Sequence, residues 1–431
     1  MRHSSAPRGR LPRAALLAGL LGLLAGGPSA HGNGLRLVSQ DAFASARGEA
    51  FVATADNPSA VHYNPAGLAQ LPGTQLRSGL YALDFNLRYQ PPASASNAGN
   101  TYETKNDFAL APQLFLSHRL PSDRLAVGVG LYAPYGAAIE WPEDTGFRSV
   151  ATQGELLHLR LNPALAARLT PALSVGAGVM VDYGDLSLEQ GLLRFAQPFT
   201  NHFRFQGDGW SVGWHAGLLW QPVPSLSLGA TFRSATAITF EGRTDLIQQP
   251  ILPPTRRDAE AEFDFPWNAA VGLSWRPTPA WNLEINADYT DWGVLNDVLI
   301  RQTPAPPFPV RQNIPVNLHW AGSWLLSAGL TRYFTNGWHA SAGYAFNENS
   351  VPDDYYSPLA ADLDRHFFTL GAGRRGGRWE VDAAVQLGYG PAHEVSGSLP
   401  SSQPGLFSGQ NADGTYRFVS VGVFVSVGRR F

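Results

Sequence analysis

The sequence predicts an all-β protein: a fourteen-stranded antiparallel transmembrane β-barrel with an N-terminal hatch, or plug, inside its lumen. Three observations predict this fold: segments in which apolar and polar residues alternate, connections that alternate between short and long, and a composition rich in turn-forming and aromatic residues. The 431 residues include 45 glycines, 33 prolines and 12 tryptophans, and only 15% are charged. Since a barrel strand shows every second residue to lipid, such a chain can be polar on average and still span a membrane.

The first 32 residues have the three parts of a secretory signal peptide. Its basic region contains Arg2, Arg8, Arg10 and Arg13. The apolar segment 14–24 is too short to span a bilayer, which needs about 20 residues, and small residues follow it. Cleavage fits after Gly32 or after Ala30, so we expect an exported chain.

Residues 33–73 form the predicted hatch, because they fit neither a strand nor a surface helix. They are rich in small residues, show no steady period, and precede the first alternating segment. The pairs Asn57-Pro58 and Asn64-Pro65 favour turns, since asparagine side chains bond to nearby backbone and proline fixes φ. We therefore expect a compact plug inside the barrel that residues 74–431 form.

The segment 281–291 is the clearest predicted strand. One face carries Trp281, Leu283, Ile285, Ala287 and Tyr289, and the intervening residues are polar. A soluble sandwich has the same alternation, but an aromatic residue at each end of the apolar face suits the two interfaces of a membrane. Segments 173–183 and 379–389 repeat the pattern.

The connections predict the number of strands. Tight turn signals occur at 121–123, 171–172, 222–225, 277–280, 335–337 and 375–377. Longer connections are expected at 90–106, 136–153, 190–207, 242–259, 303–317, 349–362 and 391–414. Six short turns and seven long loops give fourteen strands, with both chain ends of the barrel on the periplasmic side.

The chain ends in an alternating strand with an aromatic terminus. Val419, Val421, Val423, Val425 and Val427 share one face with Phe431. This ending resembles the signal that the outer-membrane assembly machinery reads, so that machinery is an expected partner. A soluble sandwich would not leave such a valine stripe as an exposed edge.

Several motifs in order resemble the FadL/TodX-type outer-membrane transporters for long-chain fatty acids and other hydrophobic compounds. They are Asn64-Pro65-Ala66 in the hatch, LNPA at 161–164 with LSVGAG at 173–178, GWSVGWHAG at 209–217 with ATFRS at 230–234, and DLDR at 362–365. The resemblance covers essentially the whole mature chain. It implies a bacterial outer-membrane location, a monomer, passive uptake, and contact with outer-membrane lipid and lipopolysaccharide.

The resemblance also implies a hydrophobic ligand site beside the hatch and a kink in the third strand that opens the wall sideways. The expected ligand contacts are Phe51, Val52, Val61, Tyr63, Leu68, Tyr132 and Tyr135. The kink is expected at Pro134 and Gly136, after a strand over 124–133, because proline cannot donate a ladder hydrogen bond. The alternative is that Pro134 simply ends the strand at a loop.

The substrate class stays open at this point. The third and fourth outer loops, 190–207 and 242–259, are shorter than those that form a capture groove in fatty-acid transporters. Arg160 and Arg233 are candidate counter-ions for a substrate carboxylate, since guanidinium binds carboxylates bidentately. The alternative is a mixed-charge network that fills a polar lumen.

The sequence lacks the signals of other functional classes, namely metal or cofactor proteins, nucleic-acid-binding proteins and enzymes. There are no cysteines and no metal-binding histidine spacing, and the net charge is −3, so we expect no metal, no cofactor and no nucleic acid. No catalytic residues are predicted, because no nucleophile signature is present. The rival functions are a general diffusion porin with a water-filled lumen and, less favoured, a barrel lipase.

Overall fold

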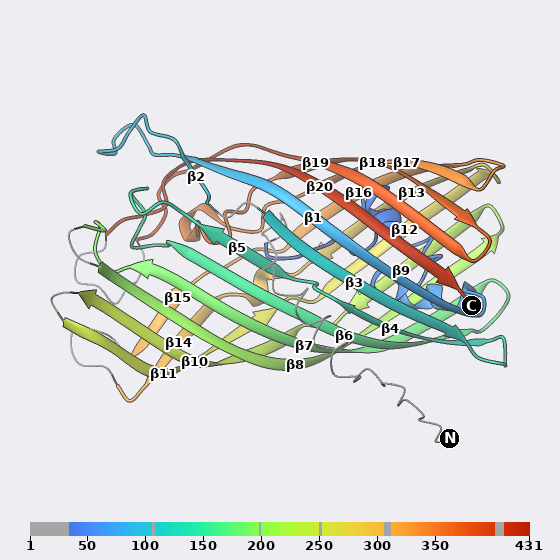
Figure 1. Cartoon of the computed structure of the whole chain (residues 1–431), viewed down its shortest axis with the longest axis horizontal. Coiled ribbons are helices and arrows are strands. Elements are labelled where there is room, and N and C mark those ends of the chain that lie inside the picture. Colours follow the sequence, from blue (N-terminus) through green and yellow to red (C-terminus); the bar gives the residue numbers. More distant parts are fainter. Residues whose placement is uncertain (1–33, 106–107, 198–199, 250–251, 306–311, 401–408) are drawn as a thin grey trace, which may run out of the picture.

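The structure is a computed structural model that describes residues 34–431 apart from 106–107, 198–199, 250–251, 306–311 and 401–408 (Figure 1). The predicted signal peptide lies outside the described residues. The described chain forms one antiparallel sheet closed into a barrel, since β1 pairs with β3 on one side and with the last strand, β20, on the other.

Twenty strands build the barrel: β1 (Thr74–Gln90), β2 (Tyr102–Glu103), β3 (Phe108–Arg119), β4 (Leu125–Tyr132), β5 (Gly136–Glu140), β6 (Gln153–Arg168), β7 (Leu173–Gly191), β8 (Thr200–Val223), β9 (Leu226–Arg233), β10 (Thr236–Gln249), β11 (Leu252–Phe265), β12 (Asn268–Thr278), β13 (Trp281–Thr290), β14 (Asp297–Thr303), β15 (Asn313–Asn317), β16 (Ser323–Tyr333), β17 (Trp338–Asn347), β18 (Arg365–Gly376), β19 (Trp379–Val395) and β20 (Gly414–Arg430).

Some of these strands are collinear, and together the twenty form fourteen strands around the barrel, as the sequence predicts. We call each of these fourteen a stave. Six staves each consist of two consecutive strands, which pair with the same neighbouring stave. These pairs are β2/β3, β4/β5, β9/β10, β11/β12, β13/β14 and β15/β16. The six predicted tight turns all fall between staves, at the end of the barrel that holds the C-terminus (Figure 1). This end is the periplasmic end of an outer-membrane barrel.

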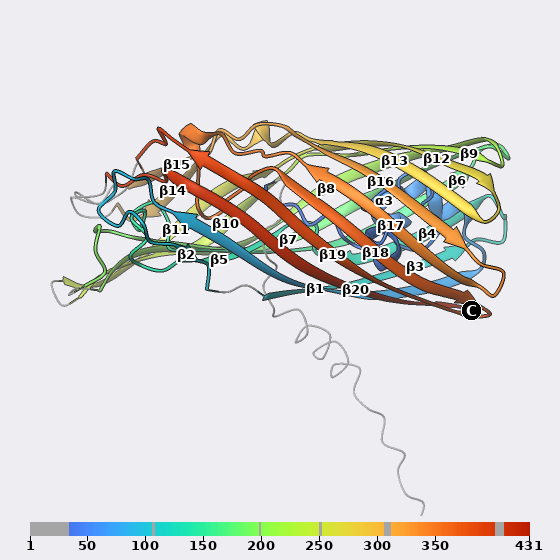
Figure 2. The same ribbon diagram turned by 90° about the horizontal axis from the view of Figure 1, so that it is seen from above.

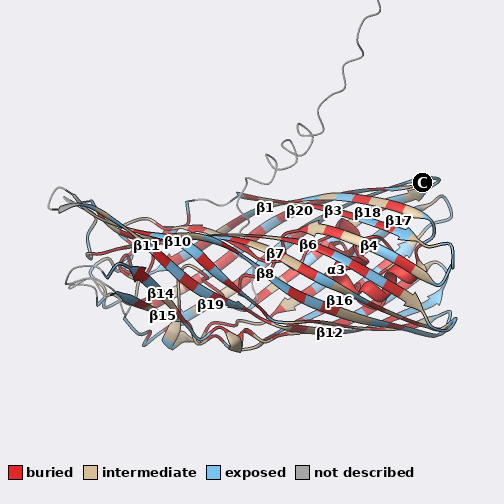
Figure 3. Cartoon of the chain, turned by 90° about the horizontal axis from the view of Figure 1, so that it is seen from below, coloured by how far each residue is buried: buried red, intermediate tan, exposed pale blue. Residues whose placement is uncertain are grey.

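The outward faces of the staves are apolar. Burial alternates along the strands (Figure 3), and the exposed side of β20 is the predicted valine stripe, from Val419 to Val427. Trp210 and Trp379 lie exposed on other staves. Among the helices of the described residues, none is long and apolar enough to cross a membrane.

The outer end differs from the prediction, because several staves extend farther than expected. The predicted loop 242–259 is wrong: β10 and β11 pair through it. Pro253 and Pro254 lie where the β10–β11 register shifts, between the pairs Leu246/Thr255 and Gln248/Leu252, and β14 pairs with β11 only over 258–260. Likewise, β8 begins inside predicted loop 190–207 and β5 lies inside predicted loop 136–153.

The N-terminal residues lie inside the barrel, at its periplasmic end (Figures 1 and 2). They form two short α-helices, α2 (Ala42–Ser45) and α3 (Ala60–Tyr63), and the 3-10 helix η1 (Pro65–Gln70). Helix η1 contacts β6, β7 and β8, while α2 contacts β18, β19 and β20. Two further 3-10 turns, η2 (Trp292–Val294) and η3 (Asp353–Tyr355), lie in connections of the barrel.

Candidate functional site

The Asn64-Pro65-Ala66 motif ties the hatch together and to the wall. The Asn64 side chain donates to the carbonyls of Val52 (2.9 Å) and of Leu218 in β8 (3.0 Å), and its Oδ1 accepts the Ala66 N–H (3.1 Å). Pro65 occupies the first turn of η1, where its missing N–H leaves no unpaired group. The motif therefore shapes the plug instead of facing a ligand directly.

Buried ion pairs fasten the hatch to the staves. Arg77 of β1 bonds to Asp41, which caps α2, and to Asp382 of β19 (2.7 Å). Arg47 reaches Glu284 of β13 (3.2 Å), and both side chains are fully buried. Removing one partner of a buried pair costs about 3–5 kcal/mol, so these contacts hold the body of the hatch firmly.

Two hatch carboxyls have shifted pKa values. Burial raises the pKa of Glu49 to about 7, although hydrogen bonds from Tyr63 (2.7 Å) and Ser39 (2.8 Å) oppose that shift. Burial also acts on Asp56, but the guanidinium groups of Arg375 and Arg276 outweigh it and lower the pKa of Asp56 to about 2. Asp56 thus stays charged in a salt bridge, whereas Glu49 titrates near neutral pH.

The third stave is interrupted at Ala133, Pro134 and Tyr135 and resumes as β5. Both β4 and β5 pair with β6, so the chain continues along the same stave beyond Pro134, and the role of this interruption as a lateral opening stays a prediction. On the β4 side, β3 pairs only through residues 114–119, and no strand among the described residues pairs with that edge of residues 108–113. The wall thus has a break in its strand ladder beside Pro134.

The first described residues cover this break. We call residues Gly34–Leu37 the strap. The Leu37 N–H donates to the Pro134 carbonyl (2.8 Å), the Gly136 N–H donates to the Leu35 carbonyl (2.9 Å), and Arg36 bridges Tyr135 in antiparallel register. Backbone groups left unpaired by the broken stave are therefore satisfied by a short segment that belongs to no stave.

Side chains fix the strap at two further points. Arg36 forms a bidentate pair with Asp288 of β13, 2.8 Å for each bond, and donates to Thr290 (2.9 Å). The Gly34 N–H donates to Asp362 of the outer loop 348–364 (3.0 Å). Gly34 has φ +63°, and a β-carbon there would lie 2.6 Å from the Trp292 ring, so only glycine fits this position.

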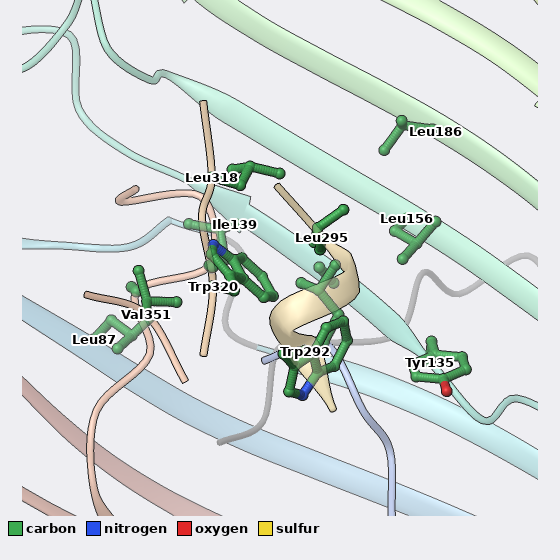
Figure 4. Close-up of a cluster of buried hydrophobic side chains, with 14 of the residues drawn as sticks. Leu87, Tyr135, Ile139, Leu156, Leu186, Trp292, Leu295, Leu318, Trp320 and Val351 are labelled. Carbon is green, nitrogen blue, oxygen red and sulfur yellow. The ribbon is translucent and has the colours of Figure 1, made fainter. Parts of the chain in front are cut away.

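A continuous apolar cluster leads from the outer loops to the break (Figure 4). Leu318 lies at its outer side, Trp320 and Trp292 follow with ring centroids 5.1 Å apart, and Trp292 lies 6.0 Å from Tyr135. All four side chains are buried. The cluster thus places apolar side chains within the lumen that reach the interrupted stave.

The predicted ligand contacts are all buried, but they fall into different groups. Tyr135 belongs to this large cluster. Val61, Leu68 and Tyr132 pack in a second cluster between the hatch and the staves β3, β4 and β6. The remaining three, Phe51, Tyr63 and Val52, lie within the hatch, where Phe51 and Tyr63 pack edge to face. Their role in ligand binding stays a prediction.

The two predicted counter-ions have different partners. Arg160 forms a bidentate pair with Asp182 (2.7 and 2.8 Å), so its charge is neutralised. Arg233 donates to Asn268 (2.5 Å) and to the His62 carbonyl. Within the described residues, no carboxylate is in ion-pair contact with Arg233, so this buried guanidinium is the better candidate for a substrate anion.

A cavity of about 110 Å³ opens at the outer end of the barrel. Its buried lining residues are Glu189, Phe203, Ile300, Ile314, Leu318 and Tyr356. Its rim includes the exposed residues Asn317, Asp354, Leu399 and Pro400. Since Leu318 also belongs to the apolar cluster, the cavity lies at the outer end of the lining that reaches the break.

A family model described as outer membrane protein transport protein (OMPP1/FadL/TodX) matches residues 22–431. The chain belongs to this family. Long-chain fatty acid transport proteins of Salmonella typhi and Escherichia coli K12 are 24% and 22% identical to it over 378 and 385 residues. These alignments cover 80% of this chain and 83% and 84% of the relatives.

Solved structures of the same family share the fold. A FadL homologue of Pseudomonas aeruginosa superposes with a TM-score of 0.81 at 19% identity, covering 92% of this chain and all of the other. The Pseudomonas putida toluene transporter TodX superposes with a TM-score of 0.69 at 18% identity, covering 92% of this chain and 99% of the other. The protein is thus an outer-membrane transport protein of the FadL/TodX family.

Some residues around the break were missed by sequence reasoning. The strap shows no strand periodicity, and a single bridge leaves no pattern to detect. Trp292 and Trp320 lie in connections between strands, where an isolated tryptophan has no periodic context. Gly34, next to Leu35 and Arg36, gave no turn signal of its own.

Proposed function

We propose that this protein takes up lipophilic molecules passively and releases them sideways into the membrane through the broken stave. The molecule enters at the outer cavity, follows the apolar lining past Trp320 and Trp292, and leaves where the strap covers Pro134. Burial of apolar ligand surface, about 25 cal/mol per Å², supplies affinity along this route. No energy source is needed for movement down a gradient.

The observation that carries the proposal is the strap in the break. A segment outside the staves satisfies the backbone of an interrupted strand, and its contacts can be exchanged for others without unfolding the barrel. A general porin would need an open lumen, whereas here the hatch helices pack against eight staves, those of β3, β4, β6, β7, β8, β18, β19 and β20, and the hatch is ion-paired to β1 and β13. A lipase finds no support among the relatives, which are transport proteins.

The substrate class is hydrophobic compounds such as long-chain fatty acids or aromatic hydrocarbons, in line with the names of the fatty-acid and toluene transporters above. Arg233 would receive the head group of a carboxylate substrate, because it is buried and makes no ion pair with a carboxylate in the part of the chain that the structure describes. The partners implied are outer-membrane lipid and lipopolysaccharide around a monomer, and the assembly machinery that reads the C-terminal strand ending in Phe431.

A disulfide lock on the strap tests the exit route. Because the chain has no cysteines, the double variant Leu35→Cys/Gly136→Cys places one new pair across the strap and the resumed strand. We expect oxidised cells to take up labelled toluene and oleate at least tenfold more slowly, with recovery on reduction. The single variant Leu35→Cys is the control. Uptake by the oxidised double variant at the wild-type rate would rule out the sideways exit.

A second variant tests the substrate head group. Arg233→Met removes the charge and keeps an apolar side chain in the lumen. If Arg233 binds a carboxylate, oleate uptake falls by tenfold or more while toluene uptake stays within about twofold. Equal losses for both compounds would mean that Arg233 only supports the hatch through His62.

A further inference from the structure

We infer that the lipid-facing wall at the periplasmic end binds the phosphates of anionic phospholipids, through three arginines that lie over tryptophan rings. We call the three couples the rim pairs: Trp281 with Arg332, Trp338 with Arg374, and Trp379 with Arg429. This surface lies outside the barrel, so its role does not depend on the route through the lumen.

Six neighbouring staves carry the rim pairs in alternation. Strands β13, β17 and β19 each contribute a tryptophan, and β16, β18 and β20 each contribute the arginine directly opposite it in the register. The pairs are also neighbours of one another, because β16 pairs with β17 and β18 pairs with β19. Five of the six side chains are exposed and Trp281 is half-buried. A row of alternating tryptophan and arginine therefore covers this arc of the wall.

The spacing along β19 places this row at the level of lipid head groups. Trp379 and Tyr389 both point outward, with 53% and 54% of each residue exposed, and the outward residues between them are apolar. Ten residues at about 3.3 Å each, on a strand tilted by about 40°, rise about 25 Å, which is the height of the apolar band of such a barrel. Arg429 is two residues from the C-terminus, which marks the periplasmic end (Figure 1). The rim pairs thus face the head groups of the periplasmic leaflet.

The guanidinium groups are held by rings and not by acids. The distances to the ring centroid are 5.2 Å for Arg332 over Trp281, 6.0 Å for Arg374 over Trp338 and 5.2 Å for Arg429 over Trp379. A guanidinium that stacks on a ring keeps the N–H groups of its edge available. Within the described residues, none of the three arginines is in ion-pair contact with a carboxylate. Phosphate oxygens can take up these donors bidentately.

Other parts of the wall lack this combination. On the opposite arc, Trp275 of β12 lies between Leu226 and Leu283, so an aromatic anchor is present there without a charge opposite it. At the outer end, exposed arginines are paired with acids: Arg243 and Arg256 with Asp245, and Arg301 with Glu260.

Uncompensated charge at the rim pairs selects the type of head group. Three cations without acidic partners attract an anionic head group such as phosphatidylglycerol. They repel the ammonium group of zwitterionic phosphatidylethanolamine. A cation beside an anionic lipid surface contributes a preference of about fivefold.

Lipid retention measures this preference. The protein is placed in nanodiscs with equal amounts of phosphatidylglycerol and phosphatidylethanolamine, and native mass spectrometry counts the lipids that stay bound. We expect the wild type to retain phosphatidylglycerol about fivefold over phosphatidylethanolamine. The triple variant Arg332→Gln/Arg374→Gln/Arg429→Gln should show no preference.

A matched triple variant controls for net charge. Arg243→Gln/Arg256→Gln/Arg301→Gln removes the same charge at the outer end and should keep the wild-type preference. A third variant, with the three rim tryptophans changed to leucine, keeps the charge and should lose about half of the preference, because the guanidinium groups lose their support. Heat-modifiable migration on gels confirms that each barrel is folded.

The outcomes separate the rim pairs from a general charge effect. Equal preference in the wild type and the rim arginine variant, or equal losses in the two arginine variants, would overturn the site. An unchanged preference in the leucine variant would overturn the role of stacking. Phosphatidylglycerol with a photoreactive head group should label peptides that contain Arg332, Arg374 and Arg429, and labelling confined to other peptides would also overturn the site. Uptake of labelled toluene is followed in parallel: normal uptake without lipid preference defeats this inference alone, whereas lipid preference without uptake of any apolar compound defeats only the proposed function.

Discussion

Arg36→Ala is the sharpest test of how the strap is held. The substitution removes a bidentate bond to Asp288, at 2.8 Å for each oxygen, and a bond to Thr290 at 2.9 Å. Both members of the pair are largely buried, with 8% and 12% of their side chains exposed. Deleting one partner of a buried pair costs about 3–5 kcal/mol, mainly because the remaining charge is left without a partner.

This free energy destabilises the closed strap relative to the open strap, because Asp288 has lost Arg36 and is reached by water only when the strap opens. With the lower figure of about 3 kcal/mol, the open fraction rises roughly 100-fold. Amide exchange of peptides covering residues 35–40 and 133–137 should therefore accelerate by about two decades. Exchange in strand β20, which pairs with β1 and β19, should not change, since the barrel ladder is untouched.

An exposed ion pair supplies the control. Arg88 contacts Glu103 at 2.8 Å, but 59% and 47% of these side chains are exposed, and such pairs are worth about 0–1 kcal/mol. Arg88→Ala should accelerate strap exchange by less than twofold. If Arg36→Ala leaves the strap as protected as in the wild type, its position is set by the hatch alone, and the argument for a separately movable strap fails.

Three other perturbations have defined outcomes. Gly34→Ala should displace the strap and speed its amide exchange, because a β-carbon meets Trp292, whereas Gly99→Ala, also at positive φ but in open space, should leave the strap unchanged. Because burial raises the pKa of Glu49 from 4.5 to about 7, the folded state binds its proton more tightly; stability is highest in acid and falls by about 3 kcal/mol as pH rises through this range. Glu49→Gln should abolish that fall in urea titrations at pH 5 and pH 8, and a persisting fall would assign it to another group. Gly176→Val should unseat η1, because a side chain there meets the backbone of Pro65 and Ala66; limited proteolysis should then cut the hatch, and an uncut hatch would contradict the close fit.

The barrel was predictable from the sequence because its signals are local. Alternation with an aromatic residue at each end identified β13 and β19, and glycine and proline marked all six periplasmic turns. The valine stripe of β20 lies on the exposed face, as its period of two requires. Each of these features depends only on residues that are close together in the chain, so a single sequence is enough to detect it.

The outer end was less predictable, since its strands contain loop-like residues. Segment 242–259 was expected to be a loop, but β10 and β11 pair through it, and their register shifts beside Pro253 and Pro254, which cannot donate a ladder hydrogen bond. The interruption near Pro134 was expected from the family resemblance together with proline chemistry, whereas the segment that covers it was not expected. Nothing in the local pattern shows that Leu35 bonds to Gly136, about 100 residues away.

The sequence predicted inward-facing arginines and acidic residues, but it did not predict which of them form ion pairs. The mixed network of inward arginines and acids was foreseen as one alternative, and the structure shows such a network around Arg77, Arg160 and Asp382. Position alone did not distinguish Arg160 from Arg233, because that difference depends on whether a carboxylate on a neighbouring stave lies within reach. The strand register gives this information for Arg160, which lies directly opposite Asp182.

The hatch body and the strap differ in how many buried ion pairs hold them, and this difference decides which of the two moves first. The body of the hatch is held by Arg77 with Asp41, by Arg47 with Glu284, and by Asp56 with two arginines. Releasing all of these would leave several buried charges without partners, at about 3–5 kcal/mol for each pair. The strap is held by one such pair, at Arg36, by a bond from Arg36 to Thr290, by two backbone hydrogen bonds and by the bond from Gly34 to Asp362. Opening at the break therefore needs far less free energy than expelling the hatch, so a route that passes sideways under the strap is favoured over one that runs straight through the barrel.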